Sequence, residues 1–141
     1  MTAKEYLNQL RDKRHIIQAE QAKLEELERV KYDIKGVSYN VGGKSSDITD
    51  TTADTVARID AMQRRIQKQI KEYLDLFEKM TKQIDEIEKP VYREILTLRY
   101  AQDMSLDDIG ELMHYGVDNI NKLARRARAA LIALHPEIEK L

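Results

Sequence analysis

The feature that most constrains the fold of this sequence is a row of residues from Val56 to Val91 spaced at alternating intervals of three and four. Its members are Val56, Ile59, Gln63, Ile66, Ile70, Tyr73, Phe77, Met80, Ile84, Ile87 and Val91. A row sustained over about five heptads is typical of a coiled coil, because the 3.5-residue period keeps one helix face toward a partner. The single polar member, Gln63, either sets the register or is a tolerated polar end-turn.

A second long helix is expected from Thr2 to about Lys35. Thr2 and Glu5 have the spacing of a capping box, and Gly36 can end the helix. The apolar positions suffice for one partner helix; they are Leu10, Ile17, Leu24, Leu27 and Ile34. Two rods of similar length joined by one loop predict an all-α fold that begins with an antiparallel hairpin.

The connection between the rods is predicted at 36–54, GVSYNVGGKSSDITDTTAD, which is rich in Gly, Ser, Thr and Asp. Gly43, Lys44 and Ser45 invite comparison with a phosphate-binding loop. That motif requires a glycine where Ser38 stands, and it follows a strand. A hairpin connection, or a short segment that docks onto a partner, is the preferred interpretation.

Composition limits the classes of protein to consider. The chain has 42% hydrophobic and 35% charged residues and a net charge of −1, so any affinity for nucleic acid must be local. It has no cysteine and therefore no thiolate chemistry. The start of the chain lacks the apolar segment of a signal peptide, and the longest aliphatic run, 129–134, is too short to span a bilayer. We expect a cytoplasmic protein with no membrane partner.

The segment from Ser105 to Arg128 predicts two short helices joined by a tight turn. Ser105 and Asp108 have the spacing of a helix cap, and Gly110 permits close approach of a crossing helix. Gly116 can supply a turn conformation or serve as an N-cap. The second helix begins at Val117, and its apolar side consists of Val117, Ile120, Leu123, Ala124, Ala127, Leu131 and Leu134. This pattern indicates a helix-turn-helix.

Charge separates these two helices. Residues 103–111 contain four acids and no base, whereas residues 117–135 contain one acid, Asp118, and four bases: Lys122, Arg125, Arg126 and Arg128. A second helix whose early residues reach base edges and whose later residues reach phosphates is the usual arrangement of this motif. The candidate DNA-binding residues are therefore Asp118, Asn119, Asn121, Lys122, Arg125, Arg126 and Arg128.

The same segment resembles the fourth region of primary sigma factors. The residues that carry the resemblance are Leu98, Arg99 and Tyr100, followed by Ser105, Leu106, Asp107, Asp108, Ile109 and Gly110 in the family's order and spacing. It departs from the family in the second helix, where the arginine-rich contact positions fall on Val117, Asp118, Asn119, Asn121 and Lys122. The whole layout resembles small phage-encoded regulators of late transcription. The resemblance implies double-stranded DNA and RNA polymerase as partners.

Pro90 divides the predicted domains, because proline ends or kinks a helix and restricts the residue before it. The expected organisation is a helical hairpin or coiled coil at 1–89, a three-helix helix-turn-helix domain at 90–135 and a frayed tail at 136–141. Tyrosines at 92, 100 and 115 are interpreted as the edge of a small core, since they are not interleaved on the basic face.

No catalytic, cofactor or metal site is predicted. His15, His114 and His135 are far apart in sequence, and none has a second ligand at helical spacing. Asp107 and Asp108 are adjacent on a helix and point about 100° apart, so they do not form a carboxylate pair.

Two alternatives to a DNA-binding regulator remain at this point. A small packaging-terminase subunit also couples a helix-turn-helix to a coiled coil. A protein-interaction adaptor would instead be recognised by RNA polymerase through Asp107, Asp108 and Glu111. A homo-oligomer, with a dimer favoured, is expected because Leu74 and Leu76 widen the apolar row and two half-sites raise affinity.

Overall fold

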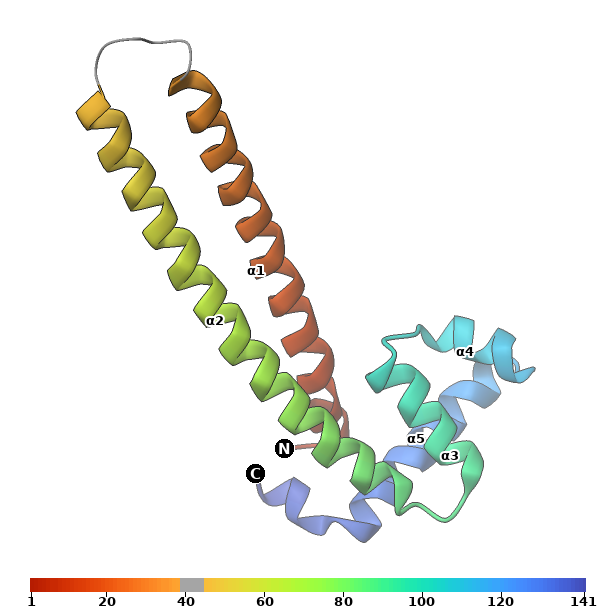
Figure 1. The fold of residues 1–141 in the computed structure, drawn as a ribbon. Helices are drawn as coiled ribbons and strands as arrows, with labels where there is room; N and C mark the ends of the chain where they lie inside the picture. The colour runs from red at the N-terminus through yellow and green to blue at the C-terminus, as the bar shows by residue number, and fades with distance from the viewer. Residues whose placement is uncertain (39–44) are drawn as a thin grey trace. The chain divides into compact units, whose positions relative to one another are not determined.

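The computed structural model describes residues 1–38 and 45–141, and it confirms the all-α prediction, with no strand in these two ranges. The elements are α1 (Ala3–Ser38), α2 (Ser45–Asp85), α3 (Pro90–Leu96), η1 (Thr97–Ala101), α4 (Leu106–Met113), α5 (Val117–Leu134) and η2 (Pro136–Lys140) (Figure 1). Here η1 is a π-helical segment and η2 a 3-10 helix. None of the helices in the described ranges is long and apolar enough to cross a bilayer.

The chain forms two compact units. Unit 1 contains residues 1–14 and 73–141, and unit 2 contains residues 15–72. Pro90 does start a new helix, since it occupies the first turn of α3. In unit 1, residues from the start of α1 and the end of α2 share a core with the C-terminal helices.

Unit 2 consists of antiparallel portions of α1 and α2 (Figure 1). The apolar row is confirmed at Ile59 and Ile66, which are both buried, and Ile17 of α1 is buried as well. Val56, the first member of the row, lines a groove between the two helices and is 42% exposed, while the neighbouring Thr55 is buried.

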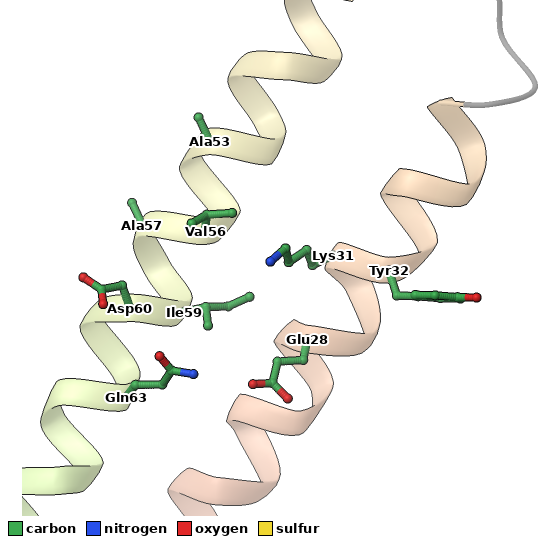
Figure 2. A pocket seen from close by; sticks show the side chains of 9 residues that line it. All are labelled: Glu28, Lys31, Tyr32, Ala53, Val56, Ala57, Ile59, Asp60 and Gln63. Carbon is green, nitrogen blue, oxygen red and sulfur yellow. The ribbon is translucent and has the colours of Figure 1, made fainter.

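A groove of about 820 Å³ lies between the two helices of unit 2 (Figure 2). Its lining mixes apolar and charged side chains: Glu28, Lys31, Tyr32, Ala53, Val56, Ala57, Ile59, Asp60 and Gln63. Gln63 is exposed there.

The main core of unit 1 joins the first turns of α1 and the last turns of α2 to the C-terminal helices. Its buried members are Tyr6, Leu7, Leu10, Met80, Ile84, Ile87, Leu96, Tyr100, Ala101, Ala127, Leu131 and Ile138. Burying a side chain the size of leucine or isoleucine contributes roughly 1.5–3 kcal/mol, so this core is the main source of stability in unit 1. A second, smaller core consists of Ile95, Ile109, Ile120 and Ala124, and it holds α3, α4 and α5 together.

Two predicted boundaries were wrong. Helix α1 continues past Gly36 to Ser38, because a glycine inside a helix costs only about 1 kcal/mol. Helix α2 begins at Ser45 and not near Asp54, since no glycine or proline interrupts the chain between residues 44 and 89. The predicted loop at 36–54 is therefore helical at both ends. Gly43 and Lys44, which invited comparison with a phosphate-binding loop, lie outside the described residues.

The tail at 136–141 is not frayed. It forms η2, and Ile138 is only 1% exposed within the main core of unit 1. The amino group of Met1 donates a 3.2 Å hydrogen bond to the carbonyl of Glu139.

Candidate nucleic-acid interface

Helix α4 begins as the sequence predicted. Ser105 is the N-cap, and its hydroxyl accepts a 3.1 Å hydrogen bond from the backbone N–H of Asp108. This contact satisfies one of the backbone donors that a helix leaves free at its start. Ile109 and Gly110 are buried, and they place one side of α4 against α5.

The turn between α4 and α5 depends on Gly110. A Cβ atom at this position would lie 2.9 Å from the carbonyl oxygen of Tyr115, which confirms that the missing side chain permits close approach. The N–H of Tyr115 donates a 2.8 Å hydrogen bond to the carbonyl of Gly110. The left-handed residue is His114, with φ 62°, while Gly116 is the N-cap of α5 with an ordinary φ of −68°. The sequence offered both roles for Gly116 and missed His114.

Helix α5 buries one side and exposes the other. Ile120, Ala124, Ala127 and Leu131 are buried. All seven predicted DNA-binding residues lie on this helix. Six are exposed and Arg128 is half-buried; the exposed six are Asp118, Asn119, Asn121, Lys122, Arg125 and Arg126. The outermost row along the helix is Asp118, Lys122 and Arg125, because residues three and four apart share a face.

The bases of α5 form no ion pair within the described ranges, whereas four of the bases on α2 do. Among the residues that the structure describes, none of Lys122, Arg125, Arg126 and Arg128 forms an ion pair. In α2, by contrast, Arg58 lies 2.9 Å from Asp54 and Arg64 lies 2.8 Å from Asp60. The positive charge of α5 is therefore not neutralised by neighbouring carboxylates.

Helix α4 carries the opposite charge. Asp107, Asp108 and Glu111 are exposed, and no ion pair to them is found within the described ranges. Two of them, Asp107 and Glu111, line a shallow groove of about 360 Å³ with an apolar wall formed by Leu106, Val117 and Ile120. The helix-turn-helix thus presents an acidic helix and a basic helix side by side.

The C-terminal end of α5 is held by a histidine between two carboxylates. In its protonated form His135 donates through Nδ1 to Glu137 at 2.9 Å and through Nε2 to Glu86 at 2.7 Å. Burial alone would lower the pKa of His135, but the hydrogen bonds to Glu137 and Glu86 and the charges of these carboxylates outweigh it and raise that pKa. His135 is thus a link between α5 and the segment that follows α2.

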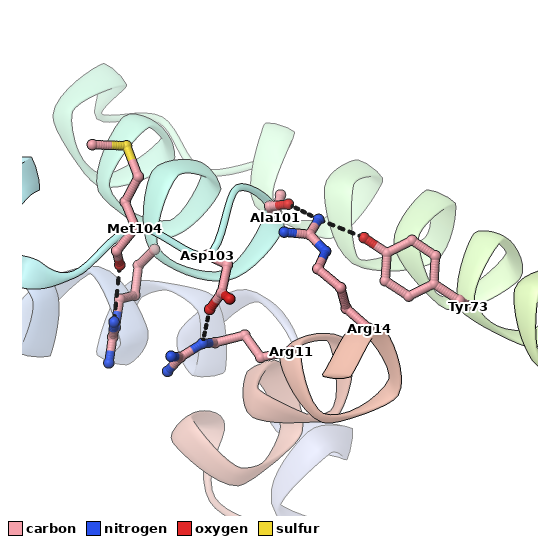
Figure 3. A network of polar contacts seen from close by, with 7 residues as sticks. Arg11, Arg14, Tyr73, Ala101, Asp103 and Met104 are labelled. Atoms are coloured by element: carbon pink, nitrogen blue, oxygen red, sulfur yellow. Dashed lines mark hydrogen bonds and ion pairs between the residues drawn. The ribbon is translucent and has the colours of Figure 1, made fainter. Parts of the chain in front are cut away.

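Sequence reasoning missed a polar network at the connection before α4. Arg11 and Arg14 of α1 bind Asp103 and the carbonyl of Ala101, respectively (Figure 3). The partners are 92 and 87 residues apart in sequence. No local pattern relates residues so far apart, so neither arginine carried a signal.

The histidines do not meet in space as a ligand set. Within the described part of the chain, no group of three His, Asp or Glu side chains is arranged to hold a metal ion. His135 and its two carboxylates are an ion-pair cluster that links helix ends. Of the three tyrosines assigned to a core edge, Tyr100 is 3% exposed, Tyr92 packs against the main core, and Tyr115 is 39% exposed.

Comparison of the chain with curated proteins, and with solved structures, gives no significant match. Comparison with family models gives one match. It covers residues 89–131, which span α3, η1, α4 and most of α5. The matched family indicates DNA binding and a transcription-related role for this segment. Residues 89–131 match the family described as sigma-70, region 4, which confirms the resemblance drawn from the sequence.

Proposed function

We propose that this protein is a sequence-specific DNA-binding regulator of transcription that inserts the first turns of α5 into the major groove. Support comes from the family match over residues 89–131 and from the exposure of one continuous face of α5. An α-helix fits the major groove of B-DNA, and the N-terminal residues of the recognition helix are those that reach base edges.

The observation that carries this proposal is the set of four α5 bases without an acidic partner. Three bases of α2 are each paired with an acid four residues away, because residues at this spacing are neighbours on one helix face. Unpaired bases attract phosphates, and they release counterions from DNA when they bind. The acid of this helix, Asp118, lies near its N-terminus, away from the three arginines.

The contacts divide by residue type. Asn119, Asn121 and Lys122 are assigned to base edges, because amides pair with adenine and an ammonium group pairs with guanine. Arg125, Arg126 and Arg128 are assigned to phosphates. Asp118 is the acceptor at the same end of the helix, suited to a cytosine amino group.

The sequence layout supports a more specific role. A long helical front joined to a region-4-like end resembles small phage or prophage regulators of late transcription. We therefore assign the protein to transcription control in the cytoplasm of a bacterial host. It acts there by binding, without a catalytic step or a cofactor.

Selection of duplexes from a randomised pool by the full-length protein tests the proposal. An enriched sequence bound at least 10³-fold more tightly than the unselected pool is expected of a specific regulator. Replacing Asn121 or Lys122 by alanine should reduce this ratio, whereas replacing Arg125 or Arg126 should weaken binding to both kinds of duplex. Equal losses on both duplexes from both sets of variants would contradict the division of roles. Failure to enrich any sequence would contradict the function.

Self-association is proposed for the same regulator. Leu74 is 55% exposed beside the apolar row of α2, and dimers place two recognition helices on two half-sites. Light scattering at tens of micromolar should give a mass above that of the 16.5 kDa chain, and a monomer with and without DNA would contradict this.

Contact with RNA polymerase is a second candidate, favoured by the exposed and unpaired acids of α4. A triple variant replaces Asp107, Asp108 and Glu111 by their amides. Immobilised RNA polymerase should no longer retain this variant, while its affinity for the selected DNA should be unchanged. Retention that survives this change would rule out α4 as the contact surface.

A further inference from the structure

Two arginines of α1 hold the segment that connects η1 to α4. Arg11 donates through Nε to the carboxylate of Asp103, and their side chains are 24% and 23% exposed. Arg14 donates to the carbonyl of Ala101 and to the hydroxyl of Tyr73 at 2.6 Å (Figure 3). Its guanidinium also lies 5.7 Å from the centre of the Tyr73 ring. A guanidinium presents five donors in a rigid planar fork and stacks on aromatic rings, whereas a lysine ammonium is a point charge on a flexible stem.

Hydrogen bonds with Leu98 and Arg99 of η1 also hold this connection. Arg99 donates a 2.9 Å hydrogen bond to the carbonyl of Met104, and the N–H of Met104 donates to the carbonyl of Leu98 at 3.0 Å. Asp103, between these anchors, has φ 57°, a left-handed conformation that costs a residue other than glycine roughly 1 kcal/mol or more. The ion pair with Arg11 offsets this cost.

We propose that Arg11 and Arg14 are positioning residues for DNA recognition, acting through the Ala101–Met104 connection on the start of α4. The inference rests on the proposed function. Both arginines lie outside the segment that matches the sigma-70, region 4 family, so it is the start of this chain that completes the helix-turn-helix unit. Ser105, the cap of α4, follows the connection directly.

The preference for one DNA sequence depends more on the position of the recognition helix than the affinity for random DNA does. Base-edge contacts require hydrogen bonds of good geometry, whereas phosphates accept contacts over a wider range of positions. Loosening the connection should therefore reduce the preference for the selected duplex more than it reduces binding to the random pool. Losing about one base contact corresponds to roughly a fivefold fall in that preference.

The Arg11–Asp103 pair allows positioning to be separated from charge. Arg11→Met removes a positive charge and Asp103→Asn removes a negative one, while asparagine still tolerates the left-handed conformation. If the pair positions the connection, both variants lower the ratio of selected to random affinity by a similar factor. The double variant is then no worse than either single variant, because both remove the same contact. Amide exchange at 102–105 should become faster in all three.

An exposed ion pair of α2 provides the control variants. Arg58→Met and Asp54→Asn break an exposed ion pair of unit 2, and they should leave the ratio unchanged. Arg14→Lys should recover less than half of the loss caused by Arg14→Leu.

Opposite effects of Arg11→Met and Asp103→Asn on DNA affinity would show that these residues act as charges near DNA and would overturn the inference. A lower stability with an unchanged ratio would also overturn it. If the wild type selects no sequence, the proposed function itself fails.

Discussion

The hydroxyl of Tyr6 donates a 2.6 Å hydrogen bond to Oε1 of Gln83 inside the main core of unit 1. The two residues are 77 positions apart, and they are 2% and 9% exposed. Burial raises the pKa of the Tyr6 hydroxyl, because the charged form is disfavoured away from water. A neutral donor thus faces an amide acceptor where the ends of α1 and α2 meet.

Tyr6→Phe should destabilise the protein by about 1–3 kcal/mol, because it leaves the buried amide oxygen of Gln83 without a donor. Replacing both residues, with Tyr6→Phe and Gln83→Leu, should cost less than the single change, since no polar atom is then stranded. Urea unfolding of the three proteins measures these differences. An unchanged free energy of unfolding for Tyr6→Phe would contradict this account, because it would show that water reaches Gln83 in the native protein.

Leu7→Ala should cost about 2–5 kcal/mol, as expected for a leucine that is 1% exposed. The cost should appear in the unfolding of the helix-turn-helix, because Leu7 belongs to the same core as Leu96 and Leu131. Near-ultraviolet circular dichroism of the tyrosines follows this unfolding. Val30→Ala, at a 40% exposed site in the unit 2 part of α1, is the control and should change stability little. Loss of unit 2 alone in the Leu7 variant would contradict the shared core.

Gly110→Ala should destabilise the helix-turn-helix by about 1–3 kcal/mol, despite the better helix propensity of alanine. Its Cβ would meet a backbone carbonyl at 2.9 Å, so the turn itself must shift. Gly116→Ser is the matched control, because nothing lies within 4 Å of a Cβ there and serine is a good N-cap. Thermal unfolding of the two variants should separate them by several degrees, and equal melting temperatures would show that the turn relaxes without cost.

The raised pKa of His135 predicts that the protein loses stability as the pH rises. Its pKa in the folded protein is raised above 6.5, so the stabilisation is complete below pH 6.5 and disappears as the pH passes through the folded value. Unfolding free energies at pH 6 and pH 8 should therefore differ less in His135→Gln than in the wild type. Glu86→Gln should give an intermediate difference. An NMR titration of the His135 ring reports the pKa directly, and a value below 6.5 would contradict this account.

The sequence predicted those features that depend on local patterns. Ser105 as a cap, Gly110 as a point of close approach and Ile59 in an apolar row all follow from residue type and spacing, and the structure confirms them. The exposed side of α5 also followed from helical periodicity. The DNA contacts assigned to that side remain a prediction.

Features that depend on distant parts of the chain were not predicted. The burial of Ile138, the pairing of Arg11 with Asp103 and the sharing of one core by both ends of the hairpin all join residues far apart in sequence. No spacing rule connects such residues, so only the folded chain reveals them. The start of α2 at Ser45 was missed for a different reason: Ser, Thr and Asp favour turns as well as the first turn of a helix.

The salt dependence of DNA binding tests the central claim that the unpaired bases of α5 face phosphates. The slope of log Kd against log salt should be smaller for Arg125→Gln/Arg126→Gln than for the wild type by about 1.8, two phosphate contacts at roughly 0.9 each. The same charge change at Arg58→Gln/Arg64→Gln, where both arginines are paired with acids in α2, should leave the slope unchanged. An unchanged slope for the α5 variant, or an equal change in the control, would contradict the account.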